Sequence, residues 1–167
     1  MSIHPIFPLG IKNSEAKIIL TPCPGTKEVD LTTSLKELKK SGAQAVLTFM
    51  TQAELEKNSL SGIGQSIKAQ GMSWFHLPIE DDEAPESPFF DAWQTAGPAI
   101  HRLIEQGKTI AVHCKGGSGR TGLVSAQILL ERGESIEPVM KRIKQLRPNA
   151  FTHACHREYL QNLANNF

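Results

Sequence analysis

Residues 110–122 read IAVHCKGGSGRTG and pass from an apolar run through a glycine-rich turn into a second apolar run. The first run is short and contains β-branched residues, as buried strands do, whereas the second is long enough for a helix. Three glycines in four positions allow the backbone of the turn to curl tightly. The stretch therefore predicts a buried strand, a tight loop and a helix in immediate succession.

The same alternation continues on both sides of this stretch. Strands are predicted at Lys17–Leu20, Ala45–Phe49, Trp74–Leu77 and Thr109–His113. Helices are predicted at 31–38, after a capping box of Thr51 with Glu54, at 63–70, from Ser87 as the cap and Pro88 as the first helical residue to 104, at 121–132, at 136–146 and near Glu158. Such alternation favours the α/β class. We expect one three-layer domain over residues 1–167, with a central, mostly parallel sheet flanked by helices.

Composition sets limits on location and partners. The chain has 167 residues, of which 40% are hydrophobic and 21% charged, and its formal net charge is +1. This charge gives no overall field for nucleic acid or an anionic membrane, so we expect neither as a partner. Three cysteines, an odd number without paired spacing, argue against a disulfide framework. Because no secretory leader or membrane-spanning run is visible, we expect a cytoplasmic protein.

The glycine-rich loop has the features of an anion site. Successive backbone N–H groups can face inward there, and the helix that follows directs its positive end to the same point. The predicted phosphate-binding residues are Lys115, Gly116, Gly117, Ser118, Gly119 and Arg120. Arg120 can hold two phosphoryl oxygens with its planar fork, and these dipoles and charges together favour thiolate over thiol at Cys114. A buried structural cysteine beside an ordinary glycine turn is the alternative interpretation.

These residues match the Cys-x5-Arg signature of the protein tyrosine phosphatase superfamily. The match includes His113 before the cysteine and the Thr121 hydroxyl after the arginine. The resemblance implies that Cys114 is the nucleophile, that Arg120 binds the transferred phosphoryl group, that Thr121 stabilises the departing thiolate and that His113 orients the loop.

A second match lies about 30 residues before the cysteine, where this superfamily carries a general-acid aspartate on a loop. Residues 78–85 read PIEDDEAP, and with the loop they resemble most closely the kinase-associated, cyclin-dependent-kinase-inhibitor-type subgroup of dual-specificity phosphatases. The spacing to Pro85 selects Asp81 as the acid, with Asp82 and then Glu83 as alternatives. A solvated acidic loop without catalytic function is the other interpretation, because runs of charge usually face water.

One position departs from the family pattern. Many relatives have a glutamine that positions the hydrolytic water after the Arg-Pro pair, whereas His156 stands at the corresponding place. His153, Cys155 and His156, with the distant Cys23, lack the paired spacing of a zinc site, so no metal ligand and no cofactor are predicted. His156 is not included among the predicted catalytic residues.

The resemblance implies a metal-independent phosphatase that forms a phosphocysteine intermediate. Its substrate would be a phosphorylated protein or peptide carrying phosphotyrosine, phosphoserine or phosphothreonine. Two alternatives remain, a rhodanese-like sulfurtransferase, which needs no Asp81, and a phosphoprotein-binding module with weak turnover. The oligomeric state is not indicated by these residues.

Overall fold

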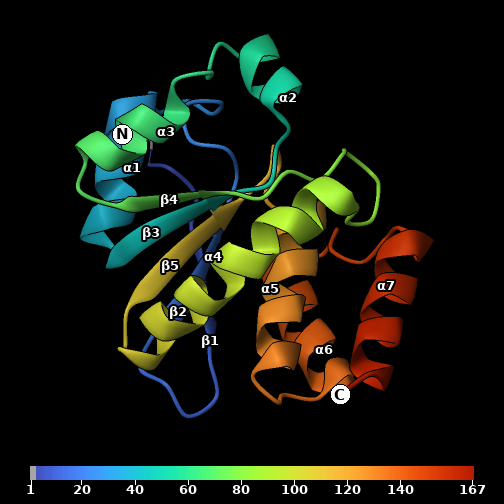
Figure 1. The fold of residues 1–167 in the computed structure, drawn as a ribbon. Coiled ribbons are helices and arrows are strands. Elements are labelled where there is room, and N and C mark those ends of the chain that lie inside the picture. Colours follow the sequence, from blue (N-terminus) through green and yellow to red (C-terminus); the bar gives the residue numbers. More distant parts are fainter. Residues whose placement is uncertain (1–2) are drawn as a thin grey trace.

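The computed structural model describes residues 3–167, so the first two residues of the predicted domain lie outside the described range. Its centre is a five-stranded sheet with the order β1-β2-β5-β3-β4 (Figure 1). The strands are β1 (Phe7–Gly10), β2 (Lys17–Thr21), β3 (Ala43–Thr48), β4 (Ser73–His76) and β5 (Thr109–His113). All neighbouring pairs are parallel except β1 with β2, which confirms the predicted mostly parallel sheet.

Seven helices lie within the described residues, on both faces of the sheet except for α2, which lies apart from it at the top of Figure 1. They are α1 (Leu31–Lys40), α2 (Gln52–Lys57), α3 (Ile63–Ala69), α4 (Ser87–Glu105), α5 (Gly119–Glu131), α6 (Ile136–Leu146) and α7 (Ala154–Asn165). Helices α1 and α3 pack against β3 and β4 on one face. On the other face α4 and α5 pack against β5 and α6 packs against β1, while α7 packs against α5 and α6. The predicted α/β class with helices on both faces is confirmed.

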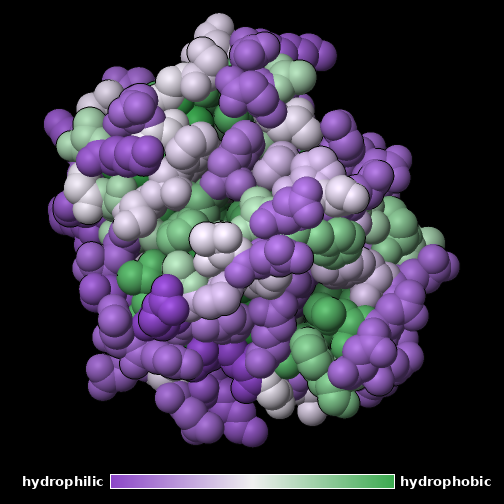
Figure 2. All heavy atoms as spheres, viewed as in Figure 1, coloured by the Kyte–Doolittle hydropathy of each residue, from purple (hydrophilic) through white to green (hydrophobic). Residues whose placement is uncertain are grey.

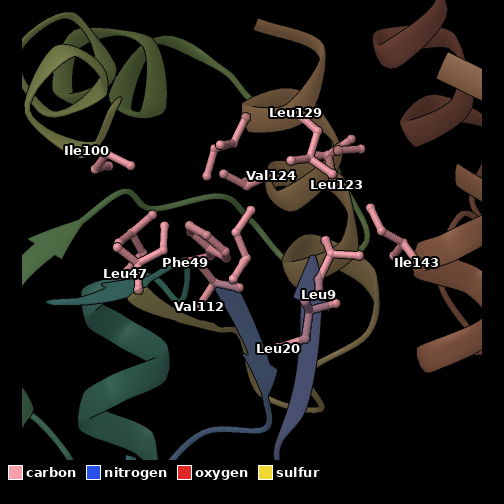
Figure 3. Close-up of a cluster of buried hydrophobic side chains, with 14 of the residues drawn as sticks. Leu9, Leu20, Leu47, Phe49, Ile100, Val112, Leu123, Val124, Leu129 and Ile143 are labelled. Atoms are coloured by element: carbon pink, nitrogen blue, oxygen red, sulfur yellow. The ribbon is translucent and has the colours of Figure 1, made fainter. Parts of the chain in front are cut away.

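Strands β2, β3, β4 and β5 divide their side chains between two cores, because successive residues of a strand point to opposite faces. In β5, Ile110 and Val112 belong to the larger core with α4 to α7, whereas Ala111 belongs to the smaller core with α1 and α3. Figure 3 shows the larger core, where Val112 and Phe49 lie near side chains of α4 and α5 such as Ile100 and Val124. Both faces of β5 are therefore fully buried, which fixes the strand that leads into the loop.

Several elements begin or end one or two residues away from their predicted bounds, for example β3, which was predicted at Ala45–Phe49, and one strand was not predicted. The short strand β1 was not predicted, and helix α4 begins at Ser87 with Glu86 as its N-cap, so that Ser87 is not the cap but the first helical residue. The capping box at the start of α2 is confirmed, since Thr51 and Glu54 exchange both of its hydrogen bonds.

On the face shown in Figure 2, polar residues dominate and the hydrophobic areas are small and separate. Among residues 3–167, no helix is long and apolar enough to cross a membrane.

Candidate active site

The loop of residues 114–118 joins the carboxyl end of β5 to the N-terminus of α5. Cys114 is buried at its start, with 4% of its surface exposed. Its Sγ accepts hydrogen bonds from the Gly117 backbone N–H at 3.3 Å and from the Thr121 hydroxyl at 3.1 Å. Two donors therefore converge on the sulfur, an arrangement that stabilises negative charge on it.

The carbonyl groups of the loop are held away from this sulfur. The carbonyl of Lys115 accepts from the Cys23 N–H at 3.0 Å, and Arg147 donates to the carbonyls of Gly116 at 2.8 Å and Gly117 at 3.1 Å. In a planar trans peptide the N–H points opposite to the carbonyl, so the N–H groups of residues 116–118 turn inward. The loop is thus lined with donors, as an anion site requires.

Arg147 organises this loop from outside, a function that the sequence analysis did not assign to it. Besides the two carbonyls, its Nε donates to the Ser118 hydroxyl at 3.1 Å, and its guanidinium lies 4.4 Å from the centre of the Phe7 ring. A planar fork with several fixed donors suits this task, because it can bind neighbouring acceptors at once.

Gly117 occupies a position that only glycine fits. Its φ is +80°, and a Cβ there would come within 2.6 Å of the backbone of Thr21 and Pro22. Backbone atoms at that distance cannot move aside without displacing the end of β2. The close approach of the loop to β2 therefore depends on the missing side chain.

His113 is buried and neutral, and it joins the loop to the sheet. Its Nδ1 lies 3.0 Å from the Cys114 carbonyl, which can only accept, so Nδ1 carries the proton. Its Nε2 then accepts from the Thr48 hydroxyl at 2.7 Å, and that oxygen accepts from the Trp74 indole at 2.8 Å. Burial lowers the pKa of His113 to about 4, which favours this neutral tautomer. The geometry agrees with the predicted orienting function of His113.

Arg120 is buried under the loop and paired with Glu54 of α2. Its two terminal nitrogens donate to the two carboxylate oxygens of Glu54 at 2.7 and 2.9 Å, and NH1 also donates to the Ile79 carbonyl at 2.9 Å. Burial alone would lower the pKa of Arg120, but the bonds to Glu54 and the negative charges nearby raise it above its ordinary value. Burial acts to raise the pKa of Glu54, yet the hydrogen bonds from Arg120 and Thr51 lower it overall. Both groups are therefore held in their charged forms.

The three candidate acids of the acid segment, residues 80–83, occupy different places. The carboxylate of Asp81 lies 3.3 Å from Arg120 NH2, whereas that of Asp82 pairs with His153 at 3.0 Å. Glu83 contributes its carbonyl to His156 and its N–H to a turn with Glu80. Among these three, Asp81 is the one paired with the loop arginine, so the geometry favours it as the general acid.

An open pocket of about 300 Å³ joins these groups. Its lining includes Cys114, Arg120 and the loop, together with Asp81, Asp82, Asn149, Thr152 and His153. Lys115 lies at its edge and donates to Asn58 at 2.9 Å, so its side chain faces α2 rather than the centre of the loop. Among residues 3–167, no group of three His, Cys, Asp or Glu side chains is arranged to hold a metal ion.

Comparison with known families identifies the chain. Residues 24–134 match the family model described as "Polymorphic toxin system, DSP-PTPase phosphatase". This range contains Glu54, Asp81 and the whole loop from Cys114 to Thr121. The chain belongs to the DSP-PTPase family of cysteine-dependent phosphatases, and neither the sulfurtransferase nor the binding-module alternative is favoured.

Individual relatives agree with this assignment. Cyclin-dependent kinase inhibitor 3 of Rattus norvegicus is 33% identical over 136 residues, which are 79% of this chain and 63% of that protein. The chain therefore spans less than two thirds of this relative's length. Protein tyrosine phosphatase type IVA 2 of Mus musculus is 27% identical over 144 residues, 86% of this chain and 80% of that protein.

Solved structures share the fold. A kinase associated phosphatase, crystallised with its catalytic cysteine replaced by serine, superimposes with a TM-score of 0.87 over 99% of this chain and 97% of that one, at 23% identity. The active form of Tk-PTP gives a TM-score of 0.73 over 96% and 97% of the two chains, at 24% identity. The expected likeness to the kinase-associated subgroup is confirmed in sequence and in fold.

Proposed function

We propose that this protein hydrolyses phosphomonoesters through a phosphocysteine intermediate at Cys114. One observation carries the proposal: Cys114 Sγ, the inward N–H groups of its loop and the Arg120–Asp81 pair face the same pocket. A nucleophile, a cradle for three phosphoryl oxygens and a proton donor are thereby within reach of one bound ester.

In the first step, the Cys114 thiolate forms a bond to phosphorus while the bond from phosphorus to the ester oxygen breaks. Asp81, in its protonated form, gives its proton to the departing oxygen. Arg120 offers the phosphoryl group its Nε–H and the NH2 hydrogen that now faces Asp81, while Glu54 keeps the rest of the guanidinium fixed. The products are the free alcohol or phenol, a phosphocysteine and the Asp81 carboxylate.

In the second step, the Asp81 carboxylate takes a proton from water as the water oxygen attacks phosphorus. The bond between sulfur and phosphorus breaks, inorganic phosphate leaves, and Cys114 departs as a thiolate. The Thr121 hydroxyl and the Gly117 N–H, which already point at the sulfur, stabilise that charge. Positive charge from Arg120 and from backbone dipoles serves the phosphoryl group in both steps, without a metal.

The proposed substrate is a phosphorylated protein or peptide. Support comes from the open form of the pocket and from the relatives, which include a kinase associated phosphatase and protein tyrosine phosphatases. We propose a cytoplasmic location, since the described chain has three free cysteines and this chemistry needs a reduced thiol.

Hydrolysis of p-nitrophenyl phosphate in the presence of EDTA, across a pH series, tests the proposal. The unmodified protein should be active and Cys114→Ser should lose turnover. Asp81→Asn should lose activity as well, by about 10²-fold or more on phenyl phosphate, whose leaving oxygen needs the proton, and by less on p-nitrophenyl phosphate. Asp82→Asn should lose less than Asp81→Asn, because it keeps the backbone N–H that binds Asp81. Asp91→Asn, at an exposed position of α4 outside the pocket lining, is the matched control and should retain full activity. An inactive unmodified protein that still binds phosphopeptides, or that transfers sulfur from thiosulfate, would contradict the proposal.

A further inference from the structure

The acid segment lies on the surface and depends on α7 for its support. The side chains of Asp81 and Asp82 are 68% and 69% exposed. Three side chains at the start of α7, namely His153, Cys155 and His156, all bind this segment, and we call them the α7 clasp. They come from a part of the chain about 70 residues further on, so the contacts are tertiary.

His156 is the buried member of the clasp, with 1% of its surface exposed. Its Nε2 lies 2.8 Å from the Glu83 carbonyl, and because a carbonyl can only accept, Nε2 carries the proton. Burial lowers the pKa of His156, which favours the neutral ring with this single donor. Its Nδ1 has no hydrogen-bond partner among the described residues. The hydrogen bond that the His156 imidazole donates therefore goes to the acid segment.

The other two members bind Asp82. His153 Nε2 lies 3.0 Å from its carboxylate, and the Cys155 thiol donates to its carbonyl at 3.4 Å. The rings of His153 and His156 meet edge to face, with centroids 5.2 Å apart. The α7 clasp therefore binds Asp82 both at its carboxylate and at its backbone carbonyl.

The position of Asp81 follows from that of Asp82. The Asp82 N–H donates to Asp81 Oδ1 at 3.1 Å, and the same oxygen lies 3.3 Å from Arg120 NH2. Asp82 has φ of +64°, a left-handed conformation that costs an aspartate less than most residues but still requires support. A continuous series of contacts thus runs from His156 and its neighbours through Asp82 to the proton donor.

We propose that His156 is a positioning residue for the general acid, acting by fixing the acid segment so that Asp81 stays directed at the pocket. The proposal rests on the proposed phosphatase function. It predicts that His156 contributes to protonation of the leaving group and has little effect on reactions that do not need that proton. A displacement of about 1 Å in a catalytic group can cost about 10²-fold in rate, so a hydrogen bond at this place can matter greatly.

The test compares two esters that differ in their need for an acid. Phenyl phosphate must release an oxygen with a pKa of about 10, whereas the nitro group of p-nitrophenyl phosphate stabilises its leaving anion. His156→Leu removes the donor and keeps an apolar side chain of moderate size. His156→Gln restores an amide N–H at the same number of bonds from the backbone. His101→Leu is the control, since His101 binds Glu131 with its Nε2 at 2.8 Å and lies outside the pocket lining.

We expect His156→Leu to reduce kcat/KM for phenyl phosphate by about ten- to a hundredfold and that for p-nitrophenyl phosphate by much less. His156→Gln should recover most of the loss, and His101→Leu should leave the ratio of the two substrates unchanged. In an Asp81→Asn background, His156→Leu should add less than about twofold, because both changes remove the same proton transfer. Amide exchange at Asp82 should be faster in His156→Leu than in His101→Leu, a readout that needs no activity.

Equal losses on both esters, or full addition to the Asp81→Asn effect, would overturn the positioning function while leaving the phosphatase function in place. Unchanged exchange at Asp82 in a folded His156→Leu variant would overturn it as well. Absence of hydrolysis of either ester by the unmodified protein contradicts the proposed function itself, and the positioning function is lost with it.

Discussion

The ion pair of Arg120 with Glu54 links the stability of the fold to the proposed chemistry in one contact. Arg120 has 2% of its side chain exposed and Glu54 24%, so the pair lies partly out of water, where an unpaired charge is costly. Glu54 also completes the capping box of α2 through its bond to the Thr51 N–H. The same carboxylate therefore fixes the start of a helix and the direction of Arg120, the proposed phosphate-binding residue.

Replacing Glu54 by glutamine separates these functions, since glutamine also serves at this position of a capping box. We expect Glu54→Gln to lower the free energy of unfolding by about 1–3 kcal/mol, because Arg120 keeps its charge but loses a bidentate partner. We also expect kcat/KM to fall by about tenfold or more, because the guanidinium is less well oriented. Urea denaturation and steady-state kinetics measure the two effects.

Glu56→Gln, two residues further along on the exposed face of α2, is the matched control and should change neither quantity appreciably. Equal free energies of unfolding and equal kcat/KM values for the two variants would show that the contact between Glu54 and Arg120 contributes to neither stability nor activity.

The residues of the site differ in how far the sequence could predict them. Cys114 and Arg120 lie in one short motif, so their proximity follows from local spacing. The capping box of Glu54 was predicted, but its bond to Arg120 spans 66 positions and has no local pattern. Arg147 was not assigned to the site, and its contacts with the loop arise from the packing of α6 against the sheet. Tertiary contacts of this kind leave no periodic signal.

At the scale of elements, the loop between β5 and α5 depends on two properties of Gly117, its positive φ and its contact with β2. Gly133, which follows α5, shares the first property, with φ of +91°, but a Cβ there would meet nothing within 4 Å. The two positions therefore distinguish backbone strain from steric conflict.

We expect Gly133→Ala to lower the free energy of unfolding by about 1 kcal/mol, from the left-handed conformation alone, and to keep full activity. Gly117→Ala should cost more and should abolish tight binding of inorganic phosphate, because the loop must move away from Thr21 and Pro22. Thermal unfolding with and without phosphate measures both, since a ligand that binds the folded state raises the Tm. Similar phosphate-induced shifts in both variants would contradict this account.

The observed bounds of helices and strands match the predicted ones most closely where a strong apolar pattern lies within the element itself. Strand β5 and helix α6 have the predicted bounds, because their apolar patterns are strong and their ends carry clear signals. Strand β1 was missed, because Pro8 and Gly10 are unfavourable in strands and its one buried residue, Leu9, gives no alternation. It forms at the edge of the sheet through antiparallel pairing with β2, which local sequence does not specify.

At the scale of the whole molecule, three histidines are buried in different parts of the fold. His4, near the N-terminus, binds the Thr21 hydroxyl, His113 binds β3 and the loop, and His156 binds the acid segment. Their exposed fractions are 2%, 0% and 1%, and burial is the main cause that lowers the pKa of each. The fold therefore contains three imidazoles that are more easily protonated in the unfolded chain than in the native state.

This difference predicts a loss of stability in mild acid. In the unfolded chain these histidines have pKa values near 6.5, whereas the native pKa of His113 is about 4. Between these values the unfolded state binds more protons, so the free energy of unfolding rises with pH and falls as pH is lowered from 6.5 towards 4. The stabilisation is complete above pH 6.5, and each full proton of difference contributes about 1.4 kcal/mol per pH unit.

Urea denaturation at pH 7.5, 6 and 5 should show this decline in the free energy of unfolding before most carboxylates titrate. His156→Gln, which retains a donor but cannot take up the proton, should make the decline shallower. A free energy of unfolding that stays constant from pH 7.5 to 5 would mean that these imidazoles gain their protons as easily in the native state as in the unfolded chain.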